Sequence, residues 1–372
     1  MAEVTEQQIL DALKRVADPD KKVDIVSLGM VSGVTVKNGH VAFAIEVEPQ
    51  RGPALEPLRK AAEQAVHGLP GVLTVSAVLT AERNVDGGPK GGHGHAHAHG
   101  QGAEAPLLPH VKAVIAVASG KGGVGKSTTS TNLAMALAQL GLKVGLFDAD
   151  IYGPSMPRML GITGEPVSPD GQTLMPMENY GVKCMSIGFL VPEDSPIIWR
   201  GPMVMGALEQ LLRDVQWGEL DVMVIDMPPG TGDTQLTISQ RVPLTGAVIV
   251  STPQDIALLD ARKGLNMFRK VDVPVLGIIE NMSYYVCPKC GDEAHIFGHG
   301  GAKAEAARLS ADFLGEVPLD IAIRETSDRG EPIVMSKPSS PHAKAYRDIA
   351  QKVWDKVQAL QGSKKGPKIS FE

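Results

Sequence analysis

The sequence lacks the features that define several classes of protein. Its 372 residues include only three cysteines, too few for the disulfide framework of a small secreted protein. No apolar run reaches the ~20 residues that span a bilayer, and nothing resembles a signal peptide. Basic residues are not in excess either, because the net charge is −6. We therefore expect a cytoplasmic protein that binds neither a membrane nor nucleic acid.

The length and the 43% hydrophobic content suit about two domains with buried cores. Residues 83–109 lack apolar periodicity and are rich in glycine and histidine, which is typical of a flexible linker. Its alternating histidines, His93, His95, His97 and His99, either keep this tether solvated or bind a metal weakly. The predicted organisation is a small domain over residues 1–82, the linker, a larger domain over residues 110–362 and a flexible tail over residues 363–372.

The first domain is predicted to be a small α+β unit of order α-β-β-α-β. Helical spacing begins at Thr5, a residue suited to the N-cap position. An Asn-Gly turn at Asn38 and Gly39 separates two segments of alternating hydrophobicity, which predicts a β-hairpin. The five elements are expected over Thr5–Ala17, Val31–Val36, His40–Val47, Pro53–His67 and Val72–Leu79.

The larger domain begins with a glycine-rich phosphate-binding motif. Residues 118–129 read ASGKGGVGKSTT and match G-x-x-x-x-G-K-[ST] between a predicted strand, Val111–Ser119, and a predicted helix, Ser127–Leu140. Glycines let backbone N–H groups wrap a polyphosphate, and the helix directs its positive end at the same anion. Lys126 would neutralise the outer phosphates and the Ser127 hydroxyl would hold Mg²⁺. The predicted nucleotide-binding residues here are Gly120, Lys121, Gly122, Gly123, Val124, Gly125, Lys126, Ser127 and Thr128.

Three carboxylates follow predicted strands of this domain. Asp148 and Asp150 come after Lys143–Phe147, at the edge of an α/β sheet where ligands gather. One of them would orient or deprotonate an attacking water; alternatively, they cap the strand end. Asp226 ends an apolar run in a Walker B pattern, which would hold Mg²⁺ directly or through its water shell. Gly230, in the loop that follows, is placed to donate its N–H to the γ-phosphate of ATP.

Later segments alternate between strand and helix. Gly246–Ser251 and Val273–Glu280 read as strands on either side of a helix over Ile256–Lys270. This alternation predicts an α/β fold with a doubly wound, mostly parallel sheet. An amphipathic segment, Ala343–Leu360, is expected to form a helix that packs on this sheet.

Two of the cysteines form a Cys-x-x-Cys-Gly motif. Cys287 and Cys290 would lie on a tight turn and direct both sulfurs to one ion or cluster. They supply two of the four ligands required. Either His295 and His299 complete a zinc site in one chain, or a second copy of the chain adds its own pair and the four thiolates bind a 4Fe-4S cluster. The third cysteine, Cys184, is expected to be a buried core residue.

Taken together, these motifs resemble those of the Mrp-type, or ApbC-like, iron-sulfur cluster carrier ATPases. These carriers belong to the deviant Walker A group, with MinD, ParA and the nitrogenase iron protein. The resemblance implies that Lys121 reaches the partner's nucleotide in a homodimer and that Asp150 positions the attacking water. It also implies that Asn281 reads the adenine base, for which its amide is suited, and that the loop of Pro318 closes over that base. An Asx turn is the alternative for Asn281.

The first domain resembles the small domain of MIP18-like iron-sulfur assembly factors. The resemblance is carried by Asp18-Pro19-Asp20 and by the segment Asp24–Val31. That family often has a cysteine after its second strand, and the corresponding stretch, Glu48–Pro53, has none. An interaction or docking role is therefore expected for this domain.

The resemblance predicts a homodimeric ATPase that uses ATP and Mg²⁺ and passes a 4Fe-4S cluster from scaffold proteins to apoprotein clients. Its catalytic residues would be Lys121, Lys126, Asp150 and Asp226. One alternative is a MinD-like or ParA-like spatial-organisation ATPase with a structural zinc at the Cys-x-x-Cys loop. It would need a membrane-binding terminal helix or a basic DNA-binding surface. A second alternative, an electron-transfer ATPase like the nitrogenase iron protein, would have widely separated cysteine ligands.

Overall fold

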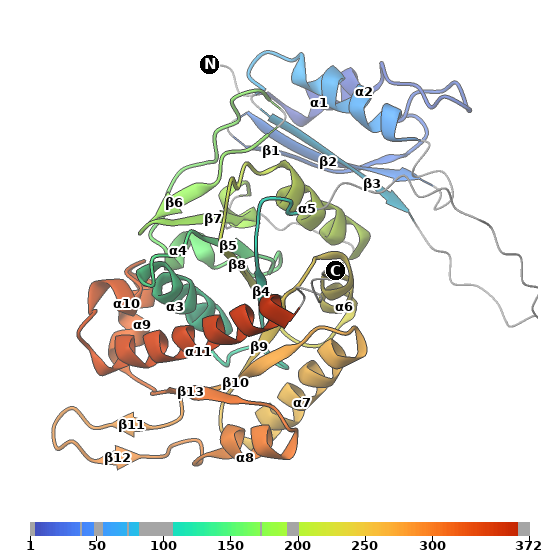
Figure 1. Ribbon diagram of the computed structural model, residues 1–372. Helices are drawn as coiled ribbons and strands as arrows, with labels where there is room; N and C mark the ends of the chain where they lie inside the picture. Colours follow the sequence, from blue (N-terminus) through green and yellow to red (C-terminus); the bar gives the residue numbers. More distant parts are fainter. Residues whose placement is uncertain are drawn as a thin grey trace, which may run out of the picture. The chain divides into compact units, whose positions relative to one another are not determined.

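The computed structural model describes residues 4–37, 39–47, 55–72, 74–81, 107–171, 173–191 and 201–363 (Figure 1). Most of the predicted linker with its four histidines, the loop 48–53 and nearly all of the predicted tail lie outside the described residues. The described part falls into two compact units. The first contains the described residues before His110, residues 168–171 and most of a later helix, α5 (Gly201–Asp214); the second contains the rest.

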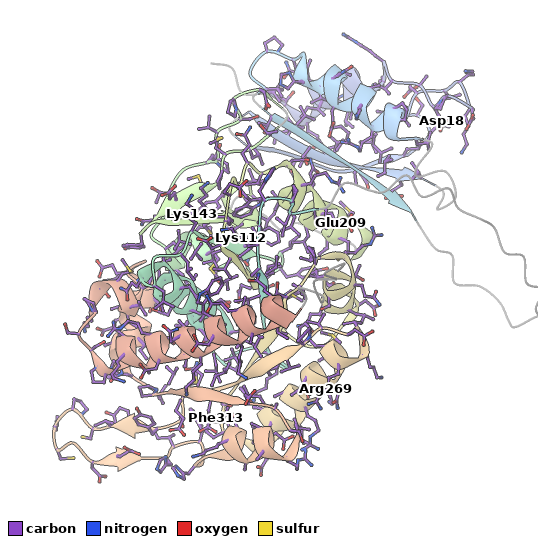
Figure 2. The ribbon with its side chains drawn as sticks, viewed as in Figure 1. Asp18, Lys112, Lys143, Glu209, Arg269 and Phe313 are labelled. Carbon is purple, nitrogen blue, oxygen red and sulfur yellow. The ribbon has the colours of Figure 1, made fainter. Side chains whose placement is uncertain are left out.

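The first unit has the predicted order of elements. Thr5 forms a capping box with Gln8, as its suitability for the N-cap suggested. The first helix ends at Leu13 rather than at Ala17, because the chain turns into a loop in which the Asp18 carboxylate accepts the N–H groups of two following residues (Figure 2). The elements are α1 (Glu6–Leu13), β1 (Val31–Lys37), β2 (His40–Val47), α2 (Glu56–His67) and β3 (Thr74–Ala81).

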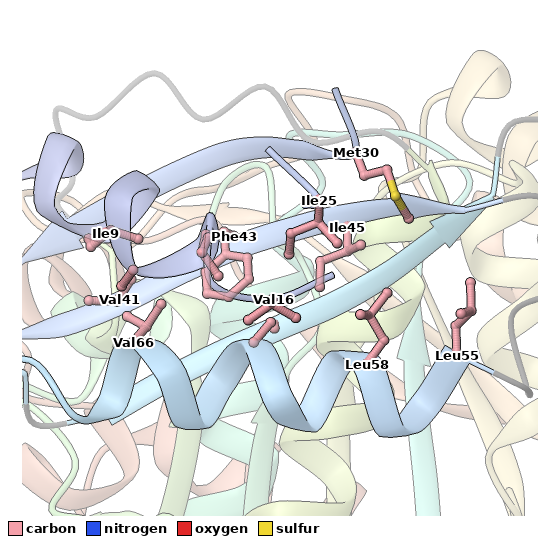
Figure 3. Packing of buried hydrophobic residues seen from close by; sticks show 14 of the residues in the cluster. Ile9, Val16, Ile25, Met30, Val41, Phe43, Ile45, Leu55, Leu58 and Val66 are labelled. Atoms are coloured by element: carbon pink, nitrogen blue, oxygen red, sulfur yellow. The ribbon is translucent and has the colours of Figure 1, made fainter. Parts of the chain in front are cut away.

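The strands of the first unit form one sheet of order β1-β2-β3. The expected hairpin is confirmed, since β1 and β2 are antiparallel; β3 returns parallel to β2 after the crossover through α2. Apolar side chains of both helices and of β2 pack together on this sheet (Figure 3). They include Ile9, Phe43, Ile45 and Val66, and full burial of each such side chain contributes about 1.5–3 kcal/mol.

The second unit is built on an eight-stranded sheet of order β13-β10-β9-β4-β8-β5-β7-β6. All neighbouring strands are parallel except β6 and β7, so the expected α/β fold with a mostly parallel sheet is confirmed. The central strands are buried throughout, as apolar runs covered on both faces should be. The strands are β4 (Val114–Ala118), β5 (Val144–Asp148), β6 (Met177–Asn179), β7 (Val182–Ser186), β8 (Val222–Asp226), β9 (Gly246–Ser251), β10 (Val275–Asn281) and β13 (Phe313–Val317).

Helices cover both faces of this sheet. The connection through α3 (Lys126–Gln139) runs from β4 to β5, whereas those through α7 (Asp255–Lys270) and α8 (Gly301–Arg308) run in the opposite direction along the sheet. Because parallel crossovers are right-handed, α3 lies on one face and α7 and α8 on the other. The remaining helices of this unit are α4 (Met156–Met159), η2 (Ile187–Phe189), α6 (Asp233–Arg241), α9 (Ile321–Asp328), α10 (Ile333–Ser336) and α11 (Pro341–Ser363).

The amphipathic segment near the end of the chain forms α11, which lies beside α3 and against β13 (Figure 1). Tyr346, Ile349 and Val353 are buried in this packing, which confirms the expectation that the helix packs on the sheet. Of the described helices, none is long and apolar enough to cross a membrane. Cys184 is fully buried in β7, as expected of a core residue.

Candidate nucleotide site and thiol hairpin

The predicted site residues gather at the carboxyl edge of the sheet. The glycine-rich loop follows β4, which lies between β8 and β9, where the chain connections diverge to the two sides of the sheet. Asp148 ends β5, Asp226 ends β8 and Asn281 ends β10. Open α/β sheets bind ligands at such a point.

The loop itself needs glycine at two positions for steric reasons. A Cβ on Gly120 would lie 2.1 Å from the carbonyl carbon of Asp260, so only a glycine lets the loop after β4 run this close to α7. Gly125 has φ +78°, and a Cβ there would lie 2.2 Å from the Asn281 amide nitrogen. Gly122 and Gly123 have open space in the direction of a Cβ, which leaves the backbone accessible to a ligand.

Lys126 and Asp226 form a buried ion pair at the start of α3. Lys126 Nζ lies 2.7 Å from Asp226 Oδ2, and the two side chains are 6% and 0% exposed. The hydroxyls of Ser127 and Ser130 donate to the two carboxylate oxygens, each at 2.6 Å. The carboxylate is therefore fully satisfied, and phosphates would have to draw Lys126 away from it. Ser130 was missed by sequence reasoning, although its place one helical turn after Lys126 puts it on the same face.

The same residues fit a magnesium ion. A hydroxyl and a carboxylate oxygen are hard donors of the type that Mg²⁺ prefers, and those of Ser127 and Asp226 lie 2.6 Å apart. Thr128 continues the helix from this point, and its carbonyl accepts the side-chain amide of Asn132 at 2.9 Å.

The structure distinguishes the two aspartates after β5. Asp148 is fully buried and accepts the N–H groups of Asp150, Ser155 and Met156 and the hydroxyl of Ser186. Burial, with the nearby Asp226 charge, raises the pKa of Asp148 to about 7. This residue is the strand-end cap that the sequence offered as an alternative, and it shapes the loop that carries Asp150.

Asp150 is half-buried and closer to solvent. Burial raises the pKa of its carboxyl group, and the Lys126 charge opposes that effect. Its Oδ1 accepts the N–H of Gly153 at 3.2 Å. Asp148 already accepts four hydrogen bonds from the protein and is fully buried, so Asp150 is the better placed of the two to meet a water molecule.

Lys121 and Gly230 each form a hydrogen bond within the protein. Lys121 Nζ lies 3.4 Å from the side-chain oxygen of Gln254, in the loop between β9 and α7. Gly230, with φ +97°, donates its N–H to the carbonyl of Ser119 at 3.1 Å. A γ-phosphate would therefore replace a backbone hydrogen bond of Gly230.

Of the base-reading candidates, Asn281 contacts the glycine-rich loop and the loop of Pro318 contacts the chain after Asn281. Asn281 donates its side-chain amide to the Val124 carbonyl at 2.8 Å. This contact joins two distant segments, whereas the Asx turn considered as the alternative would be a local hydrogen bond. The loop of Pro318 runs alongside the chain that follows Asn281. Leu319 donates its N–H to the Tyr284 carbonyl at 2.7 Å, which holds the loop there.

The two remaining thiols lie on a short hairpin that projects beyond the sheet (Figure 1). Its strands, β11 (Tyr285–Val286) and β12 (Glu293–Ala294), are antiparallel and join at the Cys-x-x-Cys turn. Cys290 is exposed and Cys287 is half-exposed. The backbone N–H groups of Cys290 and Lys289 lower the pKa of Cys287, because they stabilise its thiolate.

The two histidines offered as zinc ligands contact each other. The Nδ1 atoms of His295 and His299 lie 3.2 Å apart. Within the ranges that the structure describes, no group of three or more His, Cys, Asp or Glu side chains is arranged to hold a metal ion.

Comparison with known proteins identifies close relatives over both parts of the chain. Residues 110–354 match the family model of the NUBPL iron-transfer P-loop NTPases, and residues 6–77 match that of iron-sulfur cluster assembly proteins. An iron-sulfur cluster carrier protein of Synechocystis is 45% identical over 359 residues, covering 95% of this chain and 98% of its own. The mouse iron-sulfur cluster transfer protein NUBPL is 59% identical over 68% of this chain and 79% of its own.

A solved structure agrees with these matches. The nucleotide-binding protein of Archaeoglobus fulgidus in complex with ADP is 41% identical, with a TM-score of 0.55. The match covers 61% of this chain and 89% of that protein. The resemblance to Mrp-type carriers and to the MIP18-like domain, inferred from the motifs, is confirmed.

Proposed function

Because the chain belongs to the NUBPL family of Mrp-type iron-sulfur cluster carrier P-loop NTPases, we propose that it hydrolyses ATP and carries a 4Fe-4S cluster between its subunits. The cluster is the cargo, received from a scaffold protein and delivered to apoprotein clients in the cytoplasm. The observation that carries the proposal is a pair of thiols on one turn, the half-exposed Cys287 and the exposed Cys290, in the same unit as a complete phosphate-binding loop.

The nucleotide centre supplies the groups that phosphoryl transfer needs. Backbone N–H groups of the glycine-rich loop would bind the phosphates, and Lys126 would leave Asp226 to neutralise them. Ser127 and Asp226 would hold Mg²⁺, which offsets the negative charge of the phosphates. Asp150 would orient the attacking water, and Lys121 would reach the nucleotide of the partner subunit. Asn281 would contact the base beneath the loop of Pro318.

The hairpin supplies half of a cluster site. Two thiolates per chain leave two coordination positions of a 4Fe-4S cluster to be filled, and the same turn of a second subunit provides matching sulfurs. A lowered thiol pKa at Cys287 favours the ligating form at neutral pH. Exposure on a short hairpin suits a cargo that is handed on rather than retained. For the first unit we propose a docking role toward iron-sulfur assembly partners, in keeping with its own family match.

Anaerobic reconstitution tests the proposal. The wild-type dimer should bind about one 4Fe-4S cluster, seen by iron and sulfide analysis and by its visible absorption. The double variant Cys287→Ala/Cys290→Ala should lose the cluster but keep ATP hydrolysis. Cys184→Ala is the matched control, because it removes a thiol that is buried in β7, and it should retain the cluster. A cluster that persists in the double variant, or a monomer with one zinc ion per chain, would contradict the proposal.

A further inference from the structure

Glu280 joins the two ends of the thiol hairpin, which we define as residues 284–300. Glu280 is the penultimate residue of β10, and its side chain is fully buried. One carboxylate oxygen accepts the hydroxyl of Ser283, just before the hairpin. The other accepts the N–H of Ala302, in the first turn of α8, at 2.6 Å. A single buried side chain thus holds both the outgoing and the returning stem.

The returning stem is closely packed at this point. The N–H of Ala302 is one of the groups that a helix start leaves without an intrahelical partner, and the helix dipole favours an anion there. A Cβ on Gly301 would lie 2.6 Å from the Pro253 carbonyl oxygen. The start of α8 therefore cannot shift toward the β9–α7 loop unless that loop shifts with it.

Two contacts from the glycine-rich loop reach the same region. Asn281, the residue after Glu280, donates to the Val124 carbonyl at 2.8 Å. Lys121 Nζ lies 3.4 Å from Gln254 in the β9–α7 loop. The proposed function assigns Asn281 to the base of the subunit's own nucleotide and Lys121 to the nucleotide of the partner subunit. Binding a nucleotide would therefore change the contacts at both stems of the hairpin.

We propose that Glu280 is a positioning residue that transmits nucleotide occupancy to Cys287 and Cys290. This inference rests on the proposed function. When the subunit's own nucleotide engages Asn281 and the partner subunit's nucleotide engages Lys121, the end of β10 and the β9–α7 loop change their contacts with the glycine-rich loop. Because Glu280 binds both stems, it makes them move together, so that the surroundings of the two thiols change. Without these hydrogen bonds only the short pairing of β11 with β12 would join the two stems.

The variant Ser283→Ala tests this by removing one of the two hydrogen bonds and leaving the cap of α8 in place. Alkylation of Cys287 and Cys290 by iodoacetamide is followed by mass spectrometry in cluster-free, full-length protein, with and without a non-hydrolysable Mg-ATP analogue. In the wild type we expect the nucleotide to change the alkylation rate by about fivefold or more. In Ser283→Ala that response should largely disappear, while affinity for the analogue stays within about twofold of wild type.

Two further variants separate this role from a general loss of stability. Thr326→Val removes a comparable buried hydroxyl, which donates to the Ile323 carbonyl at 3.2 Å in α9, and it should keep the full response. Glu280→Gln keeps a hydrogen bond to each stem, since its amide oxygen can accept the Ala302 N–H and its amide nitrogen can donate to the Ser283 hydroxyl; it should therefore retain most of the wild-type response. A Ser283→Ala protein that responds like wild type would overturn the inference, as would a wild type that binds nucleotide without any change in alkylation.

The outcomes also distinguish this inference from the proposed function. A wild-type protein that binds neither ATP nor a cluster overturns both. A wild type that does both, with an undiminished response in Ser283→Ala, overturns the role of Glu280 alone.

Discussion

The nucleotide centre and the thiol hairpin hold their reactive groups in opposite ways. Asp226 is fully buried beneath three donors, whereas Cys290 lies exposed on a turn between two short strands. Burial raises the pKa of Asp148, while backbone N–H groups lower that of Cys287. A buried, fully paired centre keeps its geometry before the substrate arrives. An exposed thiolate with few neighbours can exchange its bound cargo.

The largest expected effect is a loss of ATP hydrolysis at the nucleotide centre that leaves cluster binding at the hairpin unchanged. Asp150→Asn should lower kcat for ATP hydrolysis by about 10²–10⁴-fold, because the amide cannot accept a proton from water. The number of clusters bound per dimer should stay the same, since both thiols lie on a separate hairpin after β10, whereas Asp150 lies in the loop after β5. Steady-state phosphate release and iron analysis on the same preparation check this. A kcat equal to that of the wild type would mean that Asp150 is not a catalytic residue.

The next test compares two ion pairs of equal length. Lys126–Asp226 and Lys112–Asp221 both have an N···O distance of 2.7 Å, but the lysines are 6% and 65% exposed (Lys112 is labelled in Figure 2). Lys126→Ala should lower the free energy of unfolding by about 3–5 kcal/mol, because it leaves a buried carboxylate without its cation.

The exposed pair is the matched control. Lys112→Ala should lower the free energy of unfolding far less than Lys126→Ala, because solvent screens an exposed ion pair. Urea unfolding of both variants without nucleotide checks the difference. Equal losses would mean that burial does not determine the strength of the Lys126 pair.

The smallest expected effect concerns pH. Because the pKa of Asp148 is raised to about 7 in the folded protein, its stabilising contribution is present at low pH and is lost as the pH rises through that value. Between about pH 4 and pH 8, nucleotide-free wild-type protein should lose about 2–4 kcal/mol from this residue. Asp148→Asn does not titrate, so the gap in unfolding free energy between wild type and variant should narrow as the pH rises. Urea unfolding at several pH values measures this gap. A gap that stays constant across this range would contradict the raised pKa of Asp148.

Short-range patterns were enough to predict much of the nucleotide centre. The loop around Lys126 and the apolar run ending in Asp226 have signatures that neighbouring residues determine, and the structure places both at the same sheet edge. The predicted strand Val111–Ser119 is shortened to Val114–Ala118, because Val111 forms only an isolated bridge with Leu220. The predictions for residue roles in binding and catalysis stay predictions until the variants are measured.

Other features depend on contacts between distant segments. The local sequence does not tell Asp148 from Asp150; Asp148 differs because the packing of the sheet buries it fully, next to Ser186 of another strand, which donates to it. The strands of the hairpin have two residues each, too short for a period to be read. The strand β13 was not predicted from the sequence, because Gly315 interrupts its apolar pattern. Glu280 has no sequence signal, because its partners come together only at the start of α8.

The pairing of Lys126 with Asp226 has a consequence for how the protein binds free magnesium ions. An ammonium group already occupies the position beside the carboxylate, so a free divalent ion would have to approach a lysine that repels it. We therefore expect magnesium to enter together with a polyphosphate that attracts the lysine. Between cycles of hydrolysis the protein would then be insensitive to changes in the concentration of free Mg²⁺ and would respond only to the magnesium-nucleotide complex.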